Sequence, residues 1–170
     1  MKVPAVEVKC PNCGGCAKFH EPFRFYHARR YGSAPKNAHR WGRLIVEEIF
    51  PNDFKWEQPE GETPSFRHYP TDPGEGYLFN HRGMLECPQC RAIEPTEIHW
   101  PEAAYWRWIA AGEILVARNR EHAKEIYEFL AGSHRPPNRR PSLRSIPSVM
   151  LTKQVWPELA QTILRDLVAA

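Results

Sequence analysis

The chain has 170 residues, of which 42% are hydrophobic and 12% aromatic, so it is long and apolar enough to form a core within a single domain. Its net charge of +3 is too small to indicate a polyanionic partner by itself. No stretch approaches the roughly 20 apolar residues that a membrane span needs, and no apolar signal segment follows Met1. We therefore expect a cytoplasmic protein without a membrane partner.

Two Cys-Pro-x-Cys motifs stand far apart in the chain. Each is a tight turn that points two thiolates the same way, and two facing turns supply the four sulfurs that a tetrahedral Zn²⁺ accepts at about 2.3 Å. Four thiolates leave no open position for water or substrate, so the expected role is structural. The motifs predict one zinc ion bound by Cys10, Cys13, Cys87 and Cys90.

The residues on either side of the first motif, 6 to 9 and 17 to 19, indicate the two arms of a hairpin. Gly14 follows this motif where the chain must reverse. Arg91 stands at the equivalent place in the second motif, a departure that should mildly weaken the second turn.

Cys16 is the fifth cysteine, and its role is open. With Cys10 and Cys13 it forms a C-x₂-C-x₂-C run like that of bacterial ferredoxins, but residues 17 to 86 lack the further cysteine that such a run needs. Cys16 could instead be a small buried hydrophobe or could replace Cys13 as a ligand. Disulfides fit poorly with an odd number of cysteines and no signal segment.

Residues 20 to 76 are expected to be a long irregular insertion between two halves of a zinc ribbon, 1 to 19 and 77 to 95. Within it, residues 23 to 26 could be a short strand, and residues 41 to 50 a brief helix or a buried strand. Residues 51 to 76 are rich in Pro and Gly and should be largely irregular. The charge is basic over residues 17 to 43 and acidic over residues 44 to 76.

Residues 96 to 170 predict a small antiparallel sheet with two helices. Residues 105 to 109 and 113 to 117 indicate its strands, although a helix continuing through Ala111 competes. Asn119 should cap a helix over residues 120 to 130, and Thr152 a last helix of about sixteen residues. Spacings of 3, 4 and 7 in that last helix predict a buried stripe of Val155, Leu159, Ile163, Leu164, Leu167 and Val168. The fold class is thus α+β, in one domain over residues 1 to 170.

The two cysteine motifs resemble the zinc-ribbon class. Residues 112 to 123, GEILVARNREHA, are similar to a block of small uncharacterised bacterial zinc-ribbon proteins, many of which have Trp where this chain has Val116. The resemblance covers most of residues 77 to 170 and the first motif, and leaves residues 20 to 76 unmatched. It implies a fold and a metal, and supplies no activity.

The sequence does not indicate an enzyme. A zinc deaminase needs H-x-E followed by P-C-x-x-C, but Glu86 precedes Cys87 and no His has Glu two places after it. The H-E-x-x-H, G-x-S-x-G and phosphate-loop motifs are also absent. The scattered histidines are more typical of surface and loop positions than of a catalytic site, so no small-molecule substrate is expected.

Interleaved arginine and aromatic residues at 23 to 43 favour a non-enzymatic recognition module that binds nucleic acid or docks in a nucleic-acid-handling complex. The predicted phosphate contacts are Arg24, Arg29, Arg30, Arg40, Arg43, Arg139 and Arg140. Phe23, Phe25, Tyr26, Tyr31 or Trp41 could stack on bases, or could be buried while the arginines reach into water. The alternative function is a protein-binding adaptor in a larger bacterial assembly of the defence or mobile-element type, supported by the acidic and aromatic residues at 50 to 79.

Overall fold

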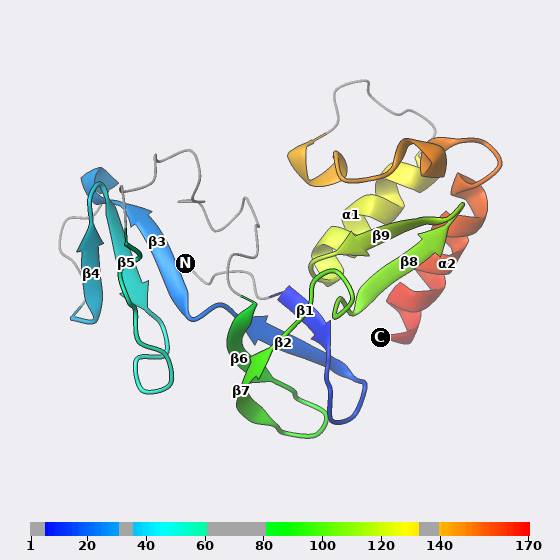
Figure 1. Cartoon of the computed structure of the whole chain (residues 1–170). Coiled ribbons are helices and arrows are strands. Elements are labelled where there is room, and N and C mark those ends of the chain that lie inside the picture. The colour runs from blue at the N-terminus through cyan, green and yellow to red at the C-terminus, as the bar shows by residue number, and fades with distance from the viewer. Residues whose placement is uncertain (1–5, 31–35, 61–80, 133–139) are drawn as a thin grey trace.

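The computed structural model describes residues 6–30, 36–60, 81–132 and 140–170, which form an α+β fold of antiparallel sheets and two α-helices. A four-stranded sheet of order β1-β2-β6-β7 carries the cysteine motifs, and we call it the cysteine sheet. A three-stranded sheet of order β3-β5-β4 is the insertion sheet. The hairpin β8-β9 with α1 and α2 is the C-terminal unit. In Figure 1 the insertion sheet and the C-terminal unit stand on opposite sides, with the cysteine sheet between and below them.

The cysteine sheet joins two distant parts of the chain. Strands β1 (Val6–Lys9) and β2 (Cys16–His20) form the predicted hairpin, and β6 (Arg82–Glu86) and β7 (Ile93–Glu97) form a second one. The two hairpins pair through β2 and β6, with Phe19 opposite Leu85. The sequence did not indicate β7, because Pro95 interrupts it, but β7 is an edge strand, where Pro is tolerated.

The expectation of an irregular insertion over residues 20 to 76 is wrong for residues 23 to 48. Strands β3 (Phe23–His27), β4 (Ala38–Trp41) and β5 (Leu44–Glu48) form a regular sheet there. Gly42, at φ 59°, lies in the two-residue turn between β4 and β5, where its left-handed backbone suits a tight hairpin. The strand alternative for residues 41 to 50 is therefore confirmed. Residues 51–60 contain no strand or helix, and residues 61 to 76 lie outside the described part of the chain.

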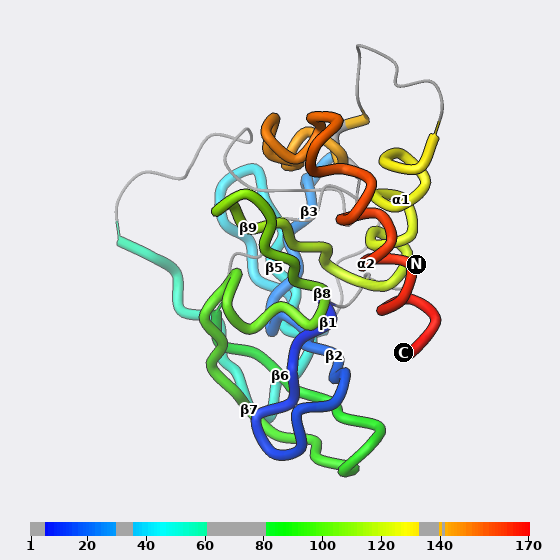
Figure 2. Tube along the Cα trace, turned by 90° about the vertical axis from the view of Figure 1, so that its right-hand side faces the viewer, coloured from blue at the N-terminus to red at the C-terminus, as the bar shows by residue number. Residues whose placement is uncertain are grey.

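The C-terminal unit confirms the predicted strand pair and helices. Strands β8 (Trp106–Ala110) and β9 (Glu113–Ala117) are antiparallel, so the competing helix through Ala111 is wrong. Helix α1 (Arg120–Ala131) begins where the side chain of Asn119 accepts from the His122 N–H at 2.9 Å, as the sequence predicted. Helix α2 (Trp156–Ala169) packs beside α1 (Figure 2), and both cover the face of the hairpin that buries Trp106, Trp108, Leu115 and Ala117.

Helix α2 departs from its prediction in two respects. Its N-cap is Val155, not Thr152, since Pro157 lacks an N–H and fits only the first turn of a helix. The predicted stripe is also too wide: Leu164 is 41% exposed and Val168 is 79% exposed.

Within the described residues, no helix is long and apolar enough to cross a membrane.

Glu7 connects the cysteine sheet to the C-terminal unit. Its N–H donates to the Arg118 carbonyl at 2.6 Å, and its carbonyl accepts from the Tyr105 N–H at 3.1 Å. Its carboxylate accepts from the Trp106 indole N–H and from the Arg120 N–H at the start of α1. A single side chain thus caps a helix and holds an indole across the boundary of the two regions.

Candidate metal centre

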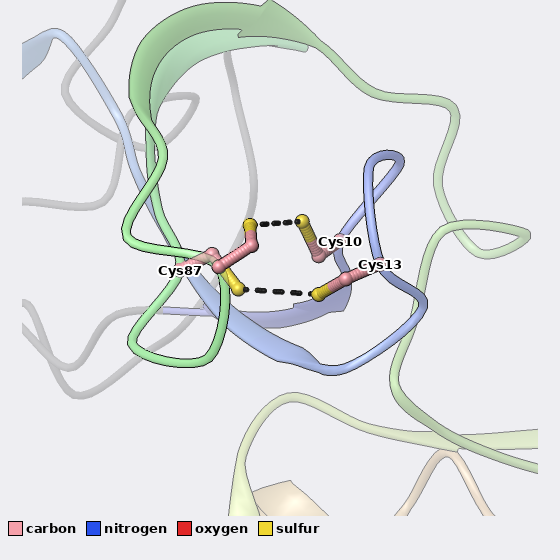
Figure 3. Close-up of side chains that lie close together, drawn as sticks. Cys10, Cys13 and Cys87 are labelled. Carbon is pink, nitrogen blue, oxygen red and sulfur yellow. Dashed lines mark hydrogen bonds between the residues drawn. The ribbon is translucent and has the colours of Figure 1, made fainter.

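The two cysteine motifs meet at one end of the cysteine sheet. The sulfurs of Cys10, Cys13, Cys87 and Cys90 all lie within 4.8 Å of one another. Two of the distances cross between the motifs: 3.6 Å from Cys10 Sγ to Cys90 Sγ, and 3.6 Å from Cys13 Sγ to Cys87 Sγ. Figure 3 shows Cys10 and Cys13 on one loop, pointing at the facing loop that carries Cys87. All five cysteines are free thiols, and the group of four can hold a metal ion.

The pairing of β2 with β6 explains why the motifs face each other. The first motif bridges β1 and β2, the second bridges β6 and β7, and the two central strands are neighbours. Each motif also closes on itself. The Cys10 N–H donates to the Gly15 carbonyl at 2.8 Å, and the Cys87 N–H donates to the Ala92 carbonyl at 2.9 Å. The sulfurs are therefore positioned by backbone ladders as well as by any bound ion.

Arg91 has the left-handed backbone that Gly14 has in the first motif. Their φ angles are 63° and 74°. This conformation is costly for a residue with a Cβ, by about 1 kcal/mol or more. The second turn thus has the same shape as the first, with the strain that its sequence predicted.

The thiols of this group differ in pKa. The backbone N–H of Cys90 is the main cause that lowers the pKa of Cys87 to about 7. The backbone N–H of Ala92 acts to lower the pKa of Cys90, but the Cys87 thiol and burial outweigh it and raise that pKa to about 12. At Cys13 the backbone N–H of Gly15 acts in the lowering direction, but burial and the thiols of Cys87 and Cys10 raise the pKa overall. Without a cation, one thiolate at Cys87 discourages a second.

Cys16 lies outside this group of four. It is half-buried in β2, opposite Lys9, and its pKa is raised to about 11 by burial and then by the nearby charge of Glu7. Its sulfur is not one of the four that lie within 4.8 Å of one another, so its position and not its pKa separates it from the candidate ligands. Among the roles left open, its position best fits that of a small half-buried side chain.

The predicted phosphate contacts fall into two sets. Arg29, Arg40 and Arg43 are exposed and gather at one end of the insertion sheet, where the Ala28 N–H donates to the Arg43 carbonyl at 2.9 Å. Arg24 and Arg140 are instead engaged, Arg24 3.9 Å from a Glu47 oxygen and Arg140 3.3 Å from a Glu125 oxygen. The Arg30 side chain and Arg139 lie outside the described residues.

The aromatic residues of the insertion sheet form its core. Phe25 is 7% exposed and Trp41 3% exposed, and Phe23 packs edge-on against Trp56 with ring centroids 5.3 Å apart. Phe25 and Trp41 are thus core residues, and Tyr26 is half-buried with the Arg24 guanidinium 6.0 Å from its ring centroid. Trp56 was among the aromatic residues expected for an adaptor surface, but it covers this small core. Tyr31, Phe66 and Tyr69 lie outside the described residues.

Glu48 is a buried carboxylate that the sequence analysis did not single out. Its side chain is 4% exposed and accepts from the Trp56 N–H at 2.8 Å, with His39 Nε2 at 3.0 Å and Lys55 Nζ at 3.4 Å. The Trp56 N–H is the main cause that lowers its pKa. This cluster fixes residues 55 and 56 against the insertion sheet. The sequence signal that could have identified Glu48 is an acidic residue within an apolar strand, because a carboxylate is buried only when it has hydrogen-bond or charged partners.

Comparison of the chain with protein-family models, with curated proteins and with solved structures gives no match. The interpretation of both the metal centre and the basic end of the insertion sheet therefore depends on their geometry alone.

Proposed function

We propose that Cys10, Cys13, Cys87 and Cys90 bind one structural Zn²⁺ and that the cysteine sheet is a zinc ribbon. Sulfurs at the corners of a tetrahedron, with metal–sulfur distances of about 2.3 Å, lie about 3.8 Å apart. The distances of 3.6 Å between motifs agree with that spacing and are far longer than a disulfide of about 2.05 Å. Thiolate sulfur also favours zinc over the hard cations Mg²⁺ and Ca²⁺.

The positive charge of a bound ion favours the thiolate form of all four cysteines. In its absence the pKa of Cys90 is raised to about 12, so the four sulfurs do not ionise together at neutral pH. A dication within bonding distance deprotonates coordinating thiols. Binding is therefore expected to release protons, and a pH indicator in weak buffer during a zinc titration of the chelated protein measures this release. No proton release on saturation would contradict thiolate ligation.

The function that the geometry supports best is a zinc-stabilised, non-enzymatic module that binds nucleic acid. The observation that carries this proposal is the gathering of Arg29, Arg40 and Arg43 at one end of the insertion sheet. Among the described residues, no carboxylate lies within ion-pair distance of these three guanidinium groups. Arginine is well suited to phosphate because it donates through a planar fork.

A binding titration tests this function. Fluorescence anisotropy with labelled duplex DNA, duplex RNA and single-stranded DNA at about 50 mM salt should show saturable binding to at least one of them, because low salt favours counterion release. The zinc-loaded protein is used throughout. No binding to any of the three probes would remove the proposed function.

A further inference from the structure

Glu47 and Glu48 of the insertion sheet have partners nearby, whereas Arg29, Arg40 and Arg43 have no carboxylate partner among the described residues. Glu47 accepts from the Tyr26 hydroxyl at 2.7 Å and lies 3.9 Å from Arg24. Glu48 is buried among the donors of His39, Lys55 and Trp56. The basic surface that remains at the end of this sheet thus has little opposing charge from the sheet itself.

The backbone brings these three arginines to the same end of the insertion sheet. Arg40 lies on β4 opposite Ile45, and its Nε donates to the Gly42 carbonyl at 3.3 Å, which turns the side chain toward the hairpin turn. Arg43 lies in that turn. Arg29 follows β3 in the short helix η1 (Ala28–Arg30), next to Arg43 through the hydrogen bond from the Ala28 N–H. We call Arg29, Arg40 and Arg43 the arginine end.

The described aromatic rings of the same sheet are buried or already have partners: the half-buried ring of Tyr26 has the Arg24 guanidinium 6.0 Å from its centroid. Phe25 and Trp41 are buried, and Phe23 packs against Trp56. Proteins that hold single strands gain much of their affinity from the stacking of bases on aromatic rings, base by base. Without it, attraction depends on the density of phosphate charge, which is highest on a duplex, at one charge per about 1.7 Å of helix axis.

Given the proposed nucleic-acid function, we infer that the arginine end binds the phosphate backbone of a double helix and does not read its bases. Arg24 and Arg140 are not part of this contact, because each is already engaged by a carboxylate. Phosphate contacts position a protein on a duplex but carry no sequence information directly. The ligand is therefore duplex nucleic acid of any sequence, and each duplex in the test is used both as DNA and as RNA.

The test is the salt dependence of binding to 20-base-pair duplexes. Three phosphate contacts give a slope of about −2.7 in log K against log salt, so binding weakens by about 40-fold between 50 and 200 mM salt. The variant Arg40→Ala/Arg43→Ala should bind more weakly and lose about two units of that slope. A/T-rich and G/C-rich duplexes should bind equally well, and single-stranded dT20 more weakly than either.

The matched control is Lys124→Ala/Arg165→Ala, which removes two positive charges from exposed ion pairs in α1 and α2. It should keep the wild-type slope. Thermal melting shows whether both double variants remain folded.

The inference is overturned if the wild-type protein binds but the slope of Arg40→Ala/Arg43→Ala is unchanged, if dT20 binds more tightly than duplex, or if the two duplexes differ by tenfold or more. In each of those cases the proposed nucleic-acid function survives. Failure of the wild-type protein to bind any nucleic acid removes both. Binding to anionic phosphatidylserine vesicles in place of duplex, lost in the same double variant, likewise overturns both.

Discussion

The cysteine sheet and the C-terminal unit differ in what holds them together. Among the described residues, the core of the C-terminal unit contains fourteen buried residues, all of them within residues 106–167. The core of the cysteine sheet contains seven, two of which are the ligand candidates Cys10 and Cys87. One region is thus stabilised mainly by apolar burial, at about 25 cal/mol per Å². The other has too small a core to be stable in the same way.

The two regions also differ in how far apart along the chain their segments lie. The strands of the cysteine sheet come from residues 6–20 and 82–97, so pairing β2 with β6 closes a long loop at an entropic cost. The C-terminal unit is formed by one continuous segment. The proposed metal cross-link between Cys10, Cys13, Cys87 and Cys90 lies in the part of the molecule where the loop is long and the core is small.

Removal of the metal should have the largest effect and should separate the two regions. Structural zinc contributes about 10–16 kcal/mol in zinc-finger peptides. We expect chelation, or Cys87→Ser, to unfold the cysteine sheet while α1 and α2 remain helical. Amide hydrogen exchange measures this, with fast exchange in β2 and β6 and retained protection in α1.

Cys16→Ser is the matched control, because Cys16 lies outside the group of four. It should retain both the metal and the protection. Loss of protection in β2 and β6 comparable to that of Cys87→Ser would mean that Cys16 is a ligand.

Truncation of the C-terminal core should have the next largest effect. Ile163 is fully buried in α2, and Ile163→Ala should reduce the free energy of unfolding by about 2–5 kcal/mol through lost burial and a cavity. Val168→Ala, at a side chain that is 79% exposed, should change the free energy of unfolding by less than about 0.5 kcal/mol. Chemical denaturation followed by far-ultraviolet circular dichroism measures both. Similar losses in the two variants would contradict the described packing of α2.

Changes at Glu7 should weaken the coupling between the regions. Glu7→Ala leaves the Trp106 indole N–H and the Arg120 N–H without their acceptor, at a cost of about 1–3 kcal/mol. Glu7→Gln keeps a carbonyl acceptor and should lose less stability than Glu7→Ala. Differential scanning calorimetry should resolve two transitions in Glu7→Ala where the wild-type protein has one. An unchanged single transition would contradict the role of Glu7 as the connection.

The C-terminal unit should also respond to pH through His122. Burial lowers the pKa of this imidazole, whose Nδ1 accepts from the Arg118 N–H at 3.3 Å and whose Nε2 lies 2.9 Å from the Ser142 carbonyl. The folded state therefore favours neutral histidine. This stability is present above the ordinary pKa of about 6.5 and is lost as the pH falls below it, since the unfolded chain then binds more protons.

Hydrogen exchange of α1 between pH 7.5 and 5.5, corrected for intrinsic rates, measures this dependence. Protection should decline toward low pH in the wild-type protein and much less in His122→Gln. An equal decline in both would assign the effect to another group.

The smallest effects concern one left-handed residue in each region. Arg91 has φ 63° in the second cysteine turn, and Ala111 has φ 50° in the turn between β8 and β9. Arg91→Gly and Ala111→Gly should each stabilise the region that contains the residue, by up to about 1 kcal/mol, because glycine adopts this conformation without strain. Local hydrogen exchange measures the gain. Destabilisation by Arg91→Gly would indicate that its side chain makes a contact worth more than the strain.

The features that local pattern determines could be predicted from the sequence. The spacing of Cys10, Cys13, Cys87 and Cys90 indicated their convergence, and Asn119 marked the start of α1. The two strands of the C-terminal hairpin followed from their apolar runs. These features depend on residues that are near one another or on one well-defined ligand chemistry.

The features that depend on tertiary contacts could not be predicted in this way. The insertion sheet is held by Trp56, which lies outside its strands and packs on Phe23, Phe25 and Trp41. The burial of Glu48 depends on donors from Lys55 and Trp56, and Val168 is 79% exposed although it continues the apolar spacing of α2. No periodicity within one segment contains that information.

The most direct test of the metal-stabilised cysteine sheet is elemental analysis of the purified protein. The account predicts one zinc per chain, lost in Cys87→Ser and retained in Cys16→Ser. A wild-type protein that holds no metal, or holds iron and sulfide in place of zinc, would contradict it.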